Sequence, residues 1–317
     1  MFLRILLFIL IGGAQARSWN EKAKYTLKTI QTITGDLFDC IDMYKQPAFD
    51  HPLLKNHTLQ LKPSSLPKGM KLAKSKSGSF YGFNDTCPSG TVLIHRARKQ
   101  DLIESKLLRN QFRAQAIANN PTAEGSHVSP IMYGTSYPRF FTFWTIDGYE
   151  KTGCGNLECP GFVSTTNIYG PGSFIPEFST YGGEQKYLSI LISRDSSTGN
   201  WWVTYNDQLP LGYFPKELLP KMDDYADAVQ MGGHVYSPLN VPSPPMGSGH
   251  PSNEGPNKAA YFIQVQAVDS SNKLTNFDTE FIKSKSDIGD YYSISDNHGS
   301  GQDKYVFAYG GAGGFTK

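Results

Sequence analysis

The sequence predicts a mainly β protein, in which an antiparallel β-sandwich follows an irregular, partly helical N-terminal region. Its 317 residues include 31 Gly and 20 Pro, and 13% of them are aromatic. Such a composition is typical of short strands joined by tight turns. From residue 131 onward, short runs alternate apolar and polar side chains, as half-buried strands do. Long amphipathic helices are scarce in the same half, so two sheets are expected to pack against each other.

Each predicted element rests on the spacing of its apolar residues. Ile30, Ile33, Leu37 and Ile41 recur at the spacing of a helix face. In the second half, aromatic and β-branched residues alternate along short runs, which favours strands. Helices are predicted at residues 19–44, 101–118 and 218–231, and strands at residues 140–146, 162–168, 187–193, 201–205, 261–268 and 305–309.

The N-terminus has the pattern of a secretory signal peptide. Arg4 gives the basic start, residues 5–11 form an apolar stretch, and Ala16 ends a small-residue cleavage signal. We expect cleavage after Ala16 and secretion, with the extracellular space, cell wall or vacuole as destinations. No later segment approaches the roughly 18 apolar residues that a membrane helix needs, so no membrane association is expected after cleavage. Asn56 and Asn84 begin Asn-X-Thr sequons, the acceptors for glycosylation in an exported protein.

The four cysteines are expected to form disulfides, because an exported protein folds in an oxidising compartment. Four cysteines allow three connectivities. In the simplest of them, Cys154 pairs with Cys159 across a short loop, and Cys40 pairs with Cys87. A zinc site is not expected, since no second Cys or His cluster has the spacing of metal ligands.

The charge is divided unequally along the chain. Residues 1–100 contain 15 Lys and Arg against 6 Asp and Glu, whereas the remainder contains 15 against 22. A basic N-terminal segment is therefore expected to lie against an acidic body at neutral pH and to loosen when carboxylates are protonated. Residues 51–84 contain six of these basic residues and no acid. A flexible basic linker is the alternative interpretation of this stretch, which is rich in Pro, Ser and Lys. Its lysines are Lys55, Lys62, Lys68, Lys71, Lys74 and Lys76.

Several common motifs do not occur in the sequence. It contains no G-x-S-x-G elbow, no H-E-x-x-H pair and no P-loop. The lack of these motifs argues against a serine hydrolase, a zinc protease and a nucleoside triphosphatase, respectively. The basic stretch lacks interleaved aromatic residues, so nucleic-acid binding is not expected.

One turn carries the strongest chemical signal. Residues 246–262, MGSGHPSNEGPNKAAYF, place Glu254 in a turn rich in Gly and Asn, directly before an alternating run. Gly and Asn accept backbone conformations closed to bulkier residues, so a tight, rigid turn is expected. A carboxylate at the mouth of a strand suits catalysis, although a solvated glutamate is the simpler interpretation. His250 could orient a substrate or tune Glu254, or bond to the backbone of its own loop.

A second signal is aromatic. Trp201, Trp202 and Tyr205 lie in the block GNWWVTYNDQLPLGYFP. Alternation directs the two tryptophans to opposite faces of a strand, so one is expected in the core. We assign Trp202 and Tyr205 to a groove, where an aromatic ring would suit a proline or a sugar. Burial of both tryptophans is the alternative.

Several blocks resemble the neprosin family, secreted plant glutamic endopeptidases that cut after proline. The turn resembles the family's G-S-G-H-x-x-x-E-G-x-x-K-A-x-Y-F signature. CIDMYKQPAFDHPLLKNH (residues 40–57) resembles its activation peptide, and CPSGTVLIHR (residues 87–96) resembles the segment that follows. RFFTFWTIDGYEKTGCGNLECPGFV (residues 139–163) and the Trp201 block are similar to its catalytic-domain blocks. The blocks occur in the family's order, which makes the resemblance specific.

The resemblance implies a signal peptide at residues 1–16, an activation region with linker at 17–100 and a β-sandwich catalytic domain at 101–317. It further implies a zymogen that cleaves proline-containing polypeptides at acidic pH, is inhibited by its own activation region and uses no metal or organic cofactor. Such enzymes place two carboxyl groups on one water, one as general base and the other as proton donor. Glu254 matches the second glutamate of the family.

The first catalytic glutamate lacks its motif. The family has I-E-A-G-W-x-V-x-P, whereas this chain has TAEGSHVSP at residues 122–130. In one alignment Glu124 is a substitute shifted by one residue, and such a shift turns a strand side chain to the opposite face. In the other, a block near residues 121–127 is missing together with the glutamate. Two functions follow: a prolyl endopeptidase that this loss impairs, or a non-catalytic extracellular β-sandwich protein that binds peptides or glycans.

Overall fold

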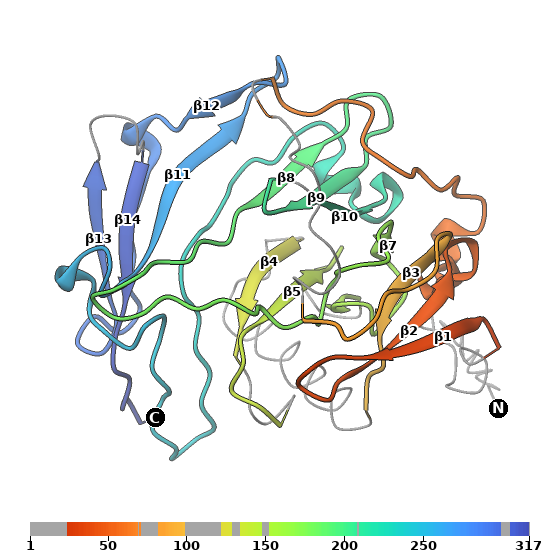
Figure 1. The fold of residues 1–317 in the computed structure, drawn as a ribbon. Coiled ribbons are helices and arrows are strands. Elements are labelled where there is room, and N and C mark those ends of the chain that lie inside the picture. The colour runs from red at the N-terminus through yellow and green to blue at the C-terminus, as the bar shows by residue number, and fades with distance from the viewer. Residues whose placement is uncertain are drawn as a thin grey trace, which may run out of the picture.

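The computed structural model of the chain is mainly β (Figure 1). Its strands form antiparallel sheets, and the helical elements among the described residues are short 3-10 turns. The predicted fold class is confirmed. The structure describes residues 24–68, 70, 82–98, 122–128, 134–147, 152–207, 209–298 and 305–316.

The N-terminal region (the described residues between 24 and 98) is built on a three-stranded sheet. The sheet has the order β1-β2-β3, and both pairings are antiparallel. A disulfide between Cys40 and Cys87 joins the central strand to the segment that precedes the third. The strands are β1 (Thr26–Gln31), β2 (Leu37–Asp42) and β3 (Thr91–His95).

The helix predicted at residues 19–44 is wrong between residues 24 and 42, which include the antiparallel strands β1 and β2. β1 contains the β-branched residues Thr26, Thr29 and Ile30, which favour an extended chain. Gly35, at a φ of +88°, turns the chain back into β2. Ile33, expected on the buried face of a helix, is 67% exposed. The helical spacing of the isoleucines was therefore coincidental.

Three 3-10 turns lead the chain from this sheet to the rest of the protein. They are η1 (Met43–Lys45), η2 (Pro47–Asp50) and η3 (Pro52–Leu54). Proline begins the last two turns, where its fixed φ is favourable and its missing N–H costs nothing. Only these turns satisfy the expectation of partial helix in the described N-terminal region.

The body of the protein (β4 to β10) contains two further sheets. The first has the order β4-β5-β6, and the second has the order β7-β10-β9-β8. The first comprises β4 (Thr122–His127), β5 (Arg139–Trp144) and β6 (Cys154–Gly155), and the second comprises β7 (Val163–Ser164), β8 (Ile190–Arg194), β9 (Trp201–Tyr205) and β10 (Leu209–Phe214).

A separate C-terminal sheet has the order β12-β11-β14-β13 and lies beside the body (Figure 1). The pairing of β11 with β14 shifts register between Phe262 and Val265, and Gln264 has a φ of 55° within this bulge. The strands are β11 (Ala260–Val268), β12 (Leu274–Asn276), β13 (Ser293–His298) and β14 (Tyr305–Gly310), with the 3-10 turns η8 (Ser252–Glu254) and η9 (Thr279–Phe281) nearby.

One continuous core joins the N-terminal region to the body. Phe38 and Leu93 from the N-terminal sheet belong to the same cluster as Phe140, Trp202 and Tyr213 from the body, and all five are fully buried. Full burial of each such side chain contributes about 1.5–3 kcal/mol. The C-terminal sheet has its own smaller cluster, whose buried members among the described residues are Val265, Tyr305 and Phe307.

Most predicted strands are confirmed, with shifted ends. The strands at residues 201–205, 261–268, 305–309, 140–146 and 187–193 correspond to β9, β11, β14, β5 and β8, whereas only Val163–Ser164 of the predicted strand 162–168 forms ladder pairs.

The helix predicted at residues 218–231 is wrong. The chain there forms two 3-10 turns, η6 (Lys216–Leu218) and η7 (Pro220–Met222), followed by irregular structure. Pro220 begins η7, where its missing N–H costs nothing, but residues 223–231 are almost all exposed, so a helix there would have little apolar surface to bury.

Two other expectations lie outside the described residues. The helix predicted at residues 101–118 and the signal peptide at residues 1–16 are not described. Over the part of the chain that is described, no helix is long and apolar enough to cross a bilayer.

Candidate functional site around Glu254

Glu254 lies in a turn whose conformation depends on glycines, directly before the C-terminal sheet strand β11. Gly247, Gly249 and Gly255 have φ values of +62°, +82° and +74°, which residues with side chains rarely adopt. A Cβ on Gly247 would lie 2.6 Å from the Cβ of Ala260, so the turn packs closely on the start of β11. This is the tight turn that the sequence predicts.

Two side chains hold the Glu254 carboxylate. The Tyr181 hydroxyl donates to Oε2 at 2.7 Å, and His250 Nδ1 lies 3.1 Å from Oε1. The ring centroids of Tyr181 and His250 are 4.2 Å apart, so the two rings support each other as well. The Glu254 side chain is 29% exposed. The carboxylate is therefore fixed in orientation yet open to water.

These contacts keep Glu254 ionised. The hydrogen bond from Tyr181, and then the one from His250, lower the pKa of Glu254 below its ordinary value. The same bond raises the pKa of Tyr181, because loss of its proton would set a phenolate against a carboxylate. A carboxylate held in this way suits a general base rather than a proton donor.

No described side chain against Glu254 is a second acid. The groups that act on its carboxylate within the described residues are Tyr181, His250 and Lys258. Glu124 lies in β4, where its backbone pairs with Thr142 of β5. The side chain of Glu124 lies outside the described ones, so the converging pair of carboxyl groups stays a prediction.

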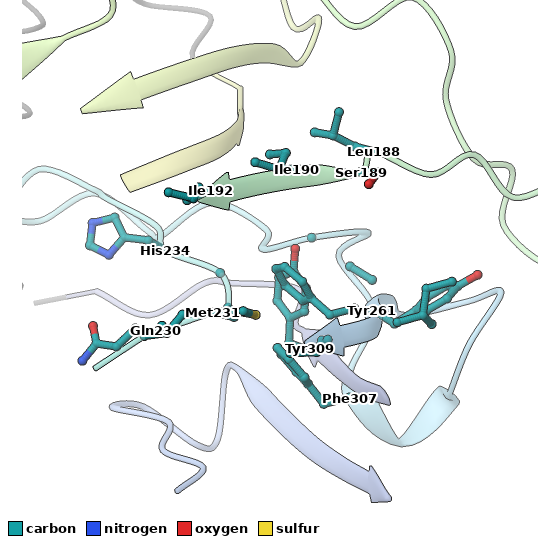
Figure 2. A pocket seen from close by; sticks show the side chains of 18 of the residues that line it. Leu188, Ser189, Ile190, Ile192, Gln230, Met231, His234, Tyr261, Phe307 and Tyr309 are labelled. Atoms are coloured by element: carbon teal, nitrogen blue, oxygen red, sulfur yellow. The ribbon is translucent and has the colours of Figure 1, made fainter. Parts of the chain in front are cut away.

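A large cleft separates the body from the C-terminal sheet. Its volume is about 4060 Å³, well above the roughly 300–1,000 Å³ of a small-molecule pocket. It is lined by β5 and β8 on the body and by β11 and β14 on the C-terminal sheet. Figure 2 shows β8 side chains facing this space, with Tyr261, Phe307 and Tyr309 on the other side. A cleft of this volume is large enough for a segment of a polymer.

His250 and Tyr181 line the cleft, whereas Glu254 lies behind them and is not among the lining residues. Met246, at the start of the Glu254 turn, and Gly311, at the end of β14, form a backbone bridge. The turn is therefore attached to one wall of the cleft.

The aromatic residues of β9 are buried. Trp202 is fully buried, and its Nε1 donates to Gln60 Oε1 at 3.3 Å. Trp201 and Tyr205 line the cleft wall but are only 8% and 2% exposed. The tryptophans do take opposite faces, with Trp201 on the cleft side and Trp202 in the core.

Sequence reasoning missed Tyr181 and the pair formed by Tyr187 and Tyr261. The hydroxyls of Tyr187 and Tyr261 lie 2.9 Å apart, and their rings meet edge to face. Both Tyr181 and Tyr187 lie on the segment before β8, more than seventy residues from their partners. The only local signal was an aromatic pair flanking Gly-Gly in TYGGEQKY, which does not identify a distant partner.

The remaining site residues fall as follows. The predicted Cys40–Cys87 disulfide is present, and Cys159 is also disulfide-bonded. The side chain of Cys154, its expected partner, lies outside the described ones. Asn56 and Asn84 are exposed. Among the described residues, no group of three His, Cys, Asp or Glu could hold a metal ion.

Comparison with known families agrees with this arrangement. Residues 29–133 match the family described as the neprosin activation peptide. Residues 106–312 match the family described as Neprosin, which covers more than half of the chain. The chain belongs to the neprosin family. The match to an activation peptide shows a pro-region, and together the two matches support a peptidase-type function. Glu254, His250 and nearly all residues that line the cleft lie within the neprosin match, whereas β1 to β3 lie almost wholly within the activation-peptide match.

Proposed function

We propose that this neprosin-family protein is a secreted glutamic peptidase zymogen that cleaves polypeptides after proline at acidic pH. The observation that carries the proposal is Glu254, an oriented and partly exposed carboxylate whose two partners, Tyr181 and His250, line the cleft. The family match and the activation-peptide match support the peptidase class.

In the proposed reaction, Glu254 is the general base. Its carboxylate takes a proton from a water molecule, whose oxygen attacks the carbonyl carbon of the scissile bond. Tyr181 and His250 hold the carboxylate in one orientation, which reduces the entropy lost on reaching the transition state. The lowered pKa of Glu254 keeps it ionised into the acidic range, so a base of this kind still operates there.

The reaction also needs a proton donor for the departing amine. Glu124 is the candidate that the sequence offers, as a substitute for the family's first glutamate. Its substitution tests that role independently of Glu254.

The test is digestion of a proline-containing peptide at acidic pH by the wild type, Glu254→Gln and Glu124→Gln. Loss of a general base typically reduces the rate by about 10²–10⁴-fold, so Glu254→Gln should be nearly inactive. Glu184→Gln is the matched control, because Glu184 is exposed and pairs with Lys186 on the same segment as Tyr181. Equal rates for the wild type and Glu254→Gln would exclude Glu254 as the base.

A second function is favoured by a specific observation. The described groups that act on Glu254 contain no other carboxyl, and a peptidase of this class needs two. A non-catalytic protein that binds extracellular peptides or glycans in the cleft would need only the aromatic and apolar walls. No cleavage by any variant, together with saturable binding of the uncut peptide, would favour this second function.

A further inference from the structure

A short segment of the N-terminal region connects the two walls of the cleft. This segment, residues 64–68, is termed the strap. In Figure 1 it is the orange chain that runs along the top of the molecule to the tip between β11 and β12. It contacts the turn between β8 and β9 at one end and the turn between β11 and β12 at the other. These turns belong to the body and to the C-terminal sheet.

The first anchor is a buried carboxylate. Asp195, in the β8–β9 turn, is 2% exposed. Its Oδ2 accepts from the Ser64 backbone N–H at 2.6 Å, from Ser64 Oγ at 2.8 Å and from Gln60 Nε2 at 2.8 Å. Hydrogen bonds to a charged group are stronger than those between neutral groups. Since three of them lead to residues 60–64, this end of the strap is firmly held.

The second anchor is backbone pairing. The Lys68 N–H donates to the Asn272 carbonyl at 2.7 Å, and Lys68 bridges Lys273 in parallel orientation. Asn272 Nδ2 donates to Ser65 Oγ and to the Leu66 carbonyl, each at 3.2 Å. Pro67 is buried between these contacts. The strap therefore pairs with the β11–β12 turn much as an added strand pairs with a sheet edge.

The strap is short enough to limit the distance between its anchors. Four residue intervals span at most about 14 Å. Both anchor turns line the cleft, through Arg194 and Ser196 on one side and through Asp269 and Asn272 on the other. A fixed strap of this length therefore sets how far the two walls can separate at this end.

The strap lies far from Glu254. β11 runs from Ala260, beside the Glu254 turn, to Val268, beside the strap. Nine residues of strand span about 27 Å. At the Glu254 end the body and the C-terminal sheet are joined without the strap, by Tyr181 to Glu254 and by Gly182 to the Asn257 carbonyl. The strap thus belongs to the activation-peptide match, but it does not contact the described Glu254 site.

We propose that the strap is a clamp, which fixes the separation of the body and the C-terminal sheet at the end of the cleft away from Glu254. Loss of either anchor loosens both turns, because one short segment connects them. The clamp does not depend on the proposed peptidase activity, and its test requires none.

The experiment is amide hydrogen exchange on the full chain at a fixed neutral pH. Asp195→Asn is compared with the wild type, and Asp207→Asn is the matched control, because Asp207 lies in the β9–β10 turn and bonds Ser189 instead of the strap. We expect the Ser64 amide of Asp195→Asn to exchange about tenfold to a hundredfold faster, from the hydrogen-bond energy lost. The decisive amides are Lys68 and the β11–β12 turn, which should exchange at least about threefold faster in Asp195→Asn and not in Asp207→Asn.

The reciprocal variant is Asn272→Asp, which keeps a residue that tolerates the φ of 56° at this position but removes the amide donor. It should speed exchange at Ser64, because coupling between two sites is reciprocal. Ser64→Ala removes only the hydroxyl contacts. It should speed exchange at the same amides as Asp195→Asn, but by a smaller factor. Acceleration confined to the altered anchor in both Asp195→Asn and Asn272→Asp would overturn the clamp.

Discussion

The N-terminal region and body bury their large aromatic side chains more completely than the C-terminal sheet does. Phe38, Trp202 and Tyr213 have no exposed surface, whereas Phe262 of the C-terminal sheet is only half-buried and Phe281 nearby is 82% exposed. One part has a core that continues across three sheets, and the other has a small cluster beside an open cleft. Stability is therefore concentrated in one part of the molecule, and access to solvent in the other.

Glu254 lies where these two parts meet. Its turn belongs to the C-terminal sheet, but Tyr181, which holds the carboxylate, comes from the body. Sites that must admit a substrate come from regions of lower local stability, because dense packing would exclude the ligand. The comparison teaches that the dense core supports the site, while the open sheet exposes it.

The largest expected effect comes from emptying the dense core. Trp202→Ala should lower the free energy of unfolding by about 3–5 kcal/mol, the usual cost of removing a buried Trp or Phe. Phe262→Ala should cost about 1–2 kcal/mol, since this ring is half-buried and stacks on Phe307 at 4.8 Å. Urea denaturation followed by circular dichroism measures both. Equal losses would remove the distinction between the two parts.

The junction between the N-terminal region and the body should be nearly as sensitive. Gln46 is fully buried, donates to the Ser164 carbonyl at 3.0 Å and accepts from the Ser164 N–H at 2.8 Å. Gln46→Ala leaves both backbone groups without their partner and should cost about 1–3 kcal/mol. Gln31→Ala is the control, because the Gln31 side chain is exposed and donates to the Gly35 carbonyl within its own turn. A loss for Gln46→Ala no larger than the control's would show that this junction contributes little.

Acid should loosen this junction through His57. Its Nε2 lies 2.9 Å from the Tyr213 hydroxyl, and its Nδ1 lies 3.5 Å from Glu217. Burial lowers the pKa of His57 below 6.5, although Glu217 opposes the shift. The unfolded chain therefore binds the proton more readily, and stability falls as the pH drops below 6.5.

His57→Gln keeps a polar group but cannot titrate. Its free energy of unfolding should decline less than that of the wild type between pH 7 and pH 5, measured by urea denaturation at each pH. Around pH 8, His57 is neutral in both the folded and the unfolded chain. There the free energy of unfolding should change with pH equally in the two proteins. Parallel declines below pH 6.5 would assign acid sensitivity to other groups.

The smallest expected effect is at the open cleft. Tyr187→Phe removes the hydroxyl contact to Tyr261, which is exposed. Hydrogen bonds in water contribute little net stability, so we expect a loss below about 0.5 kcal/mol. A loss above about 2 kcal/mol, measured as for Gln46→Ala, would mean that this contact carries much of the join between the walls.

The sequence predicted strands better than helices for a physical reason. At residues 201–205 and 261–268, aromatic and β-branched residues favour an extended chain, and both runs form strands, although β9 is buried on both faces. At residues 19–44, four apolar residues had helical spacing, but β-branched composition and pairing with β3 determined an extended chain. At residues 218–231, the chain after Met222 is almost entirely exposed, so no packing supports the helix that spacing alone favoured. Tertiary pairing overrides weak local propensity.

The candidate site was predicted only in part. Glu254 and its tight turn were evident, because glycine positions and a single carboxylate are local features. Tyr181 was not, since it lies 73 residues away and its role depends on how the body folds against the turn. Trp202 was assigned to a groove, but alternation cannot tell which of two adjacent tryptophans faces the core.

The sequence by itself determined the mainly β class and the turn that carries Glu254, and it offered the Cys40–Cys87 disulfide as part of the simplest of three connectivities. These follow from composition, spacing and the conformational freedom of glycine, which act over a few residues or through few alternatives. Only the tertiary structure decided that Tyr181 and His250 meet at one carboxylate, that the N-terminal region shares the core of the body, and that residues 64–68 join two distant turns. Those contacts depend on the packing of segments far apart in the chain, and no local pattern encodes them.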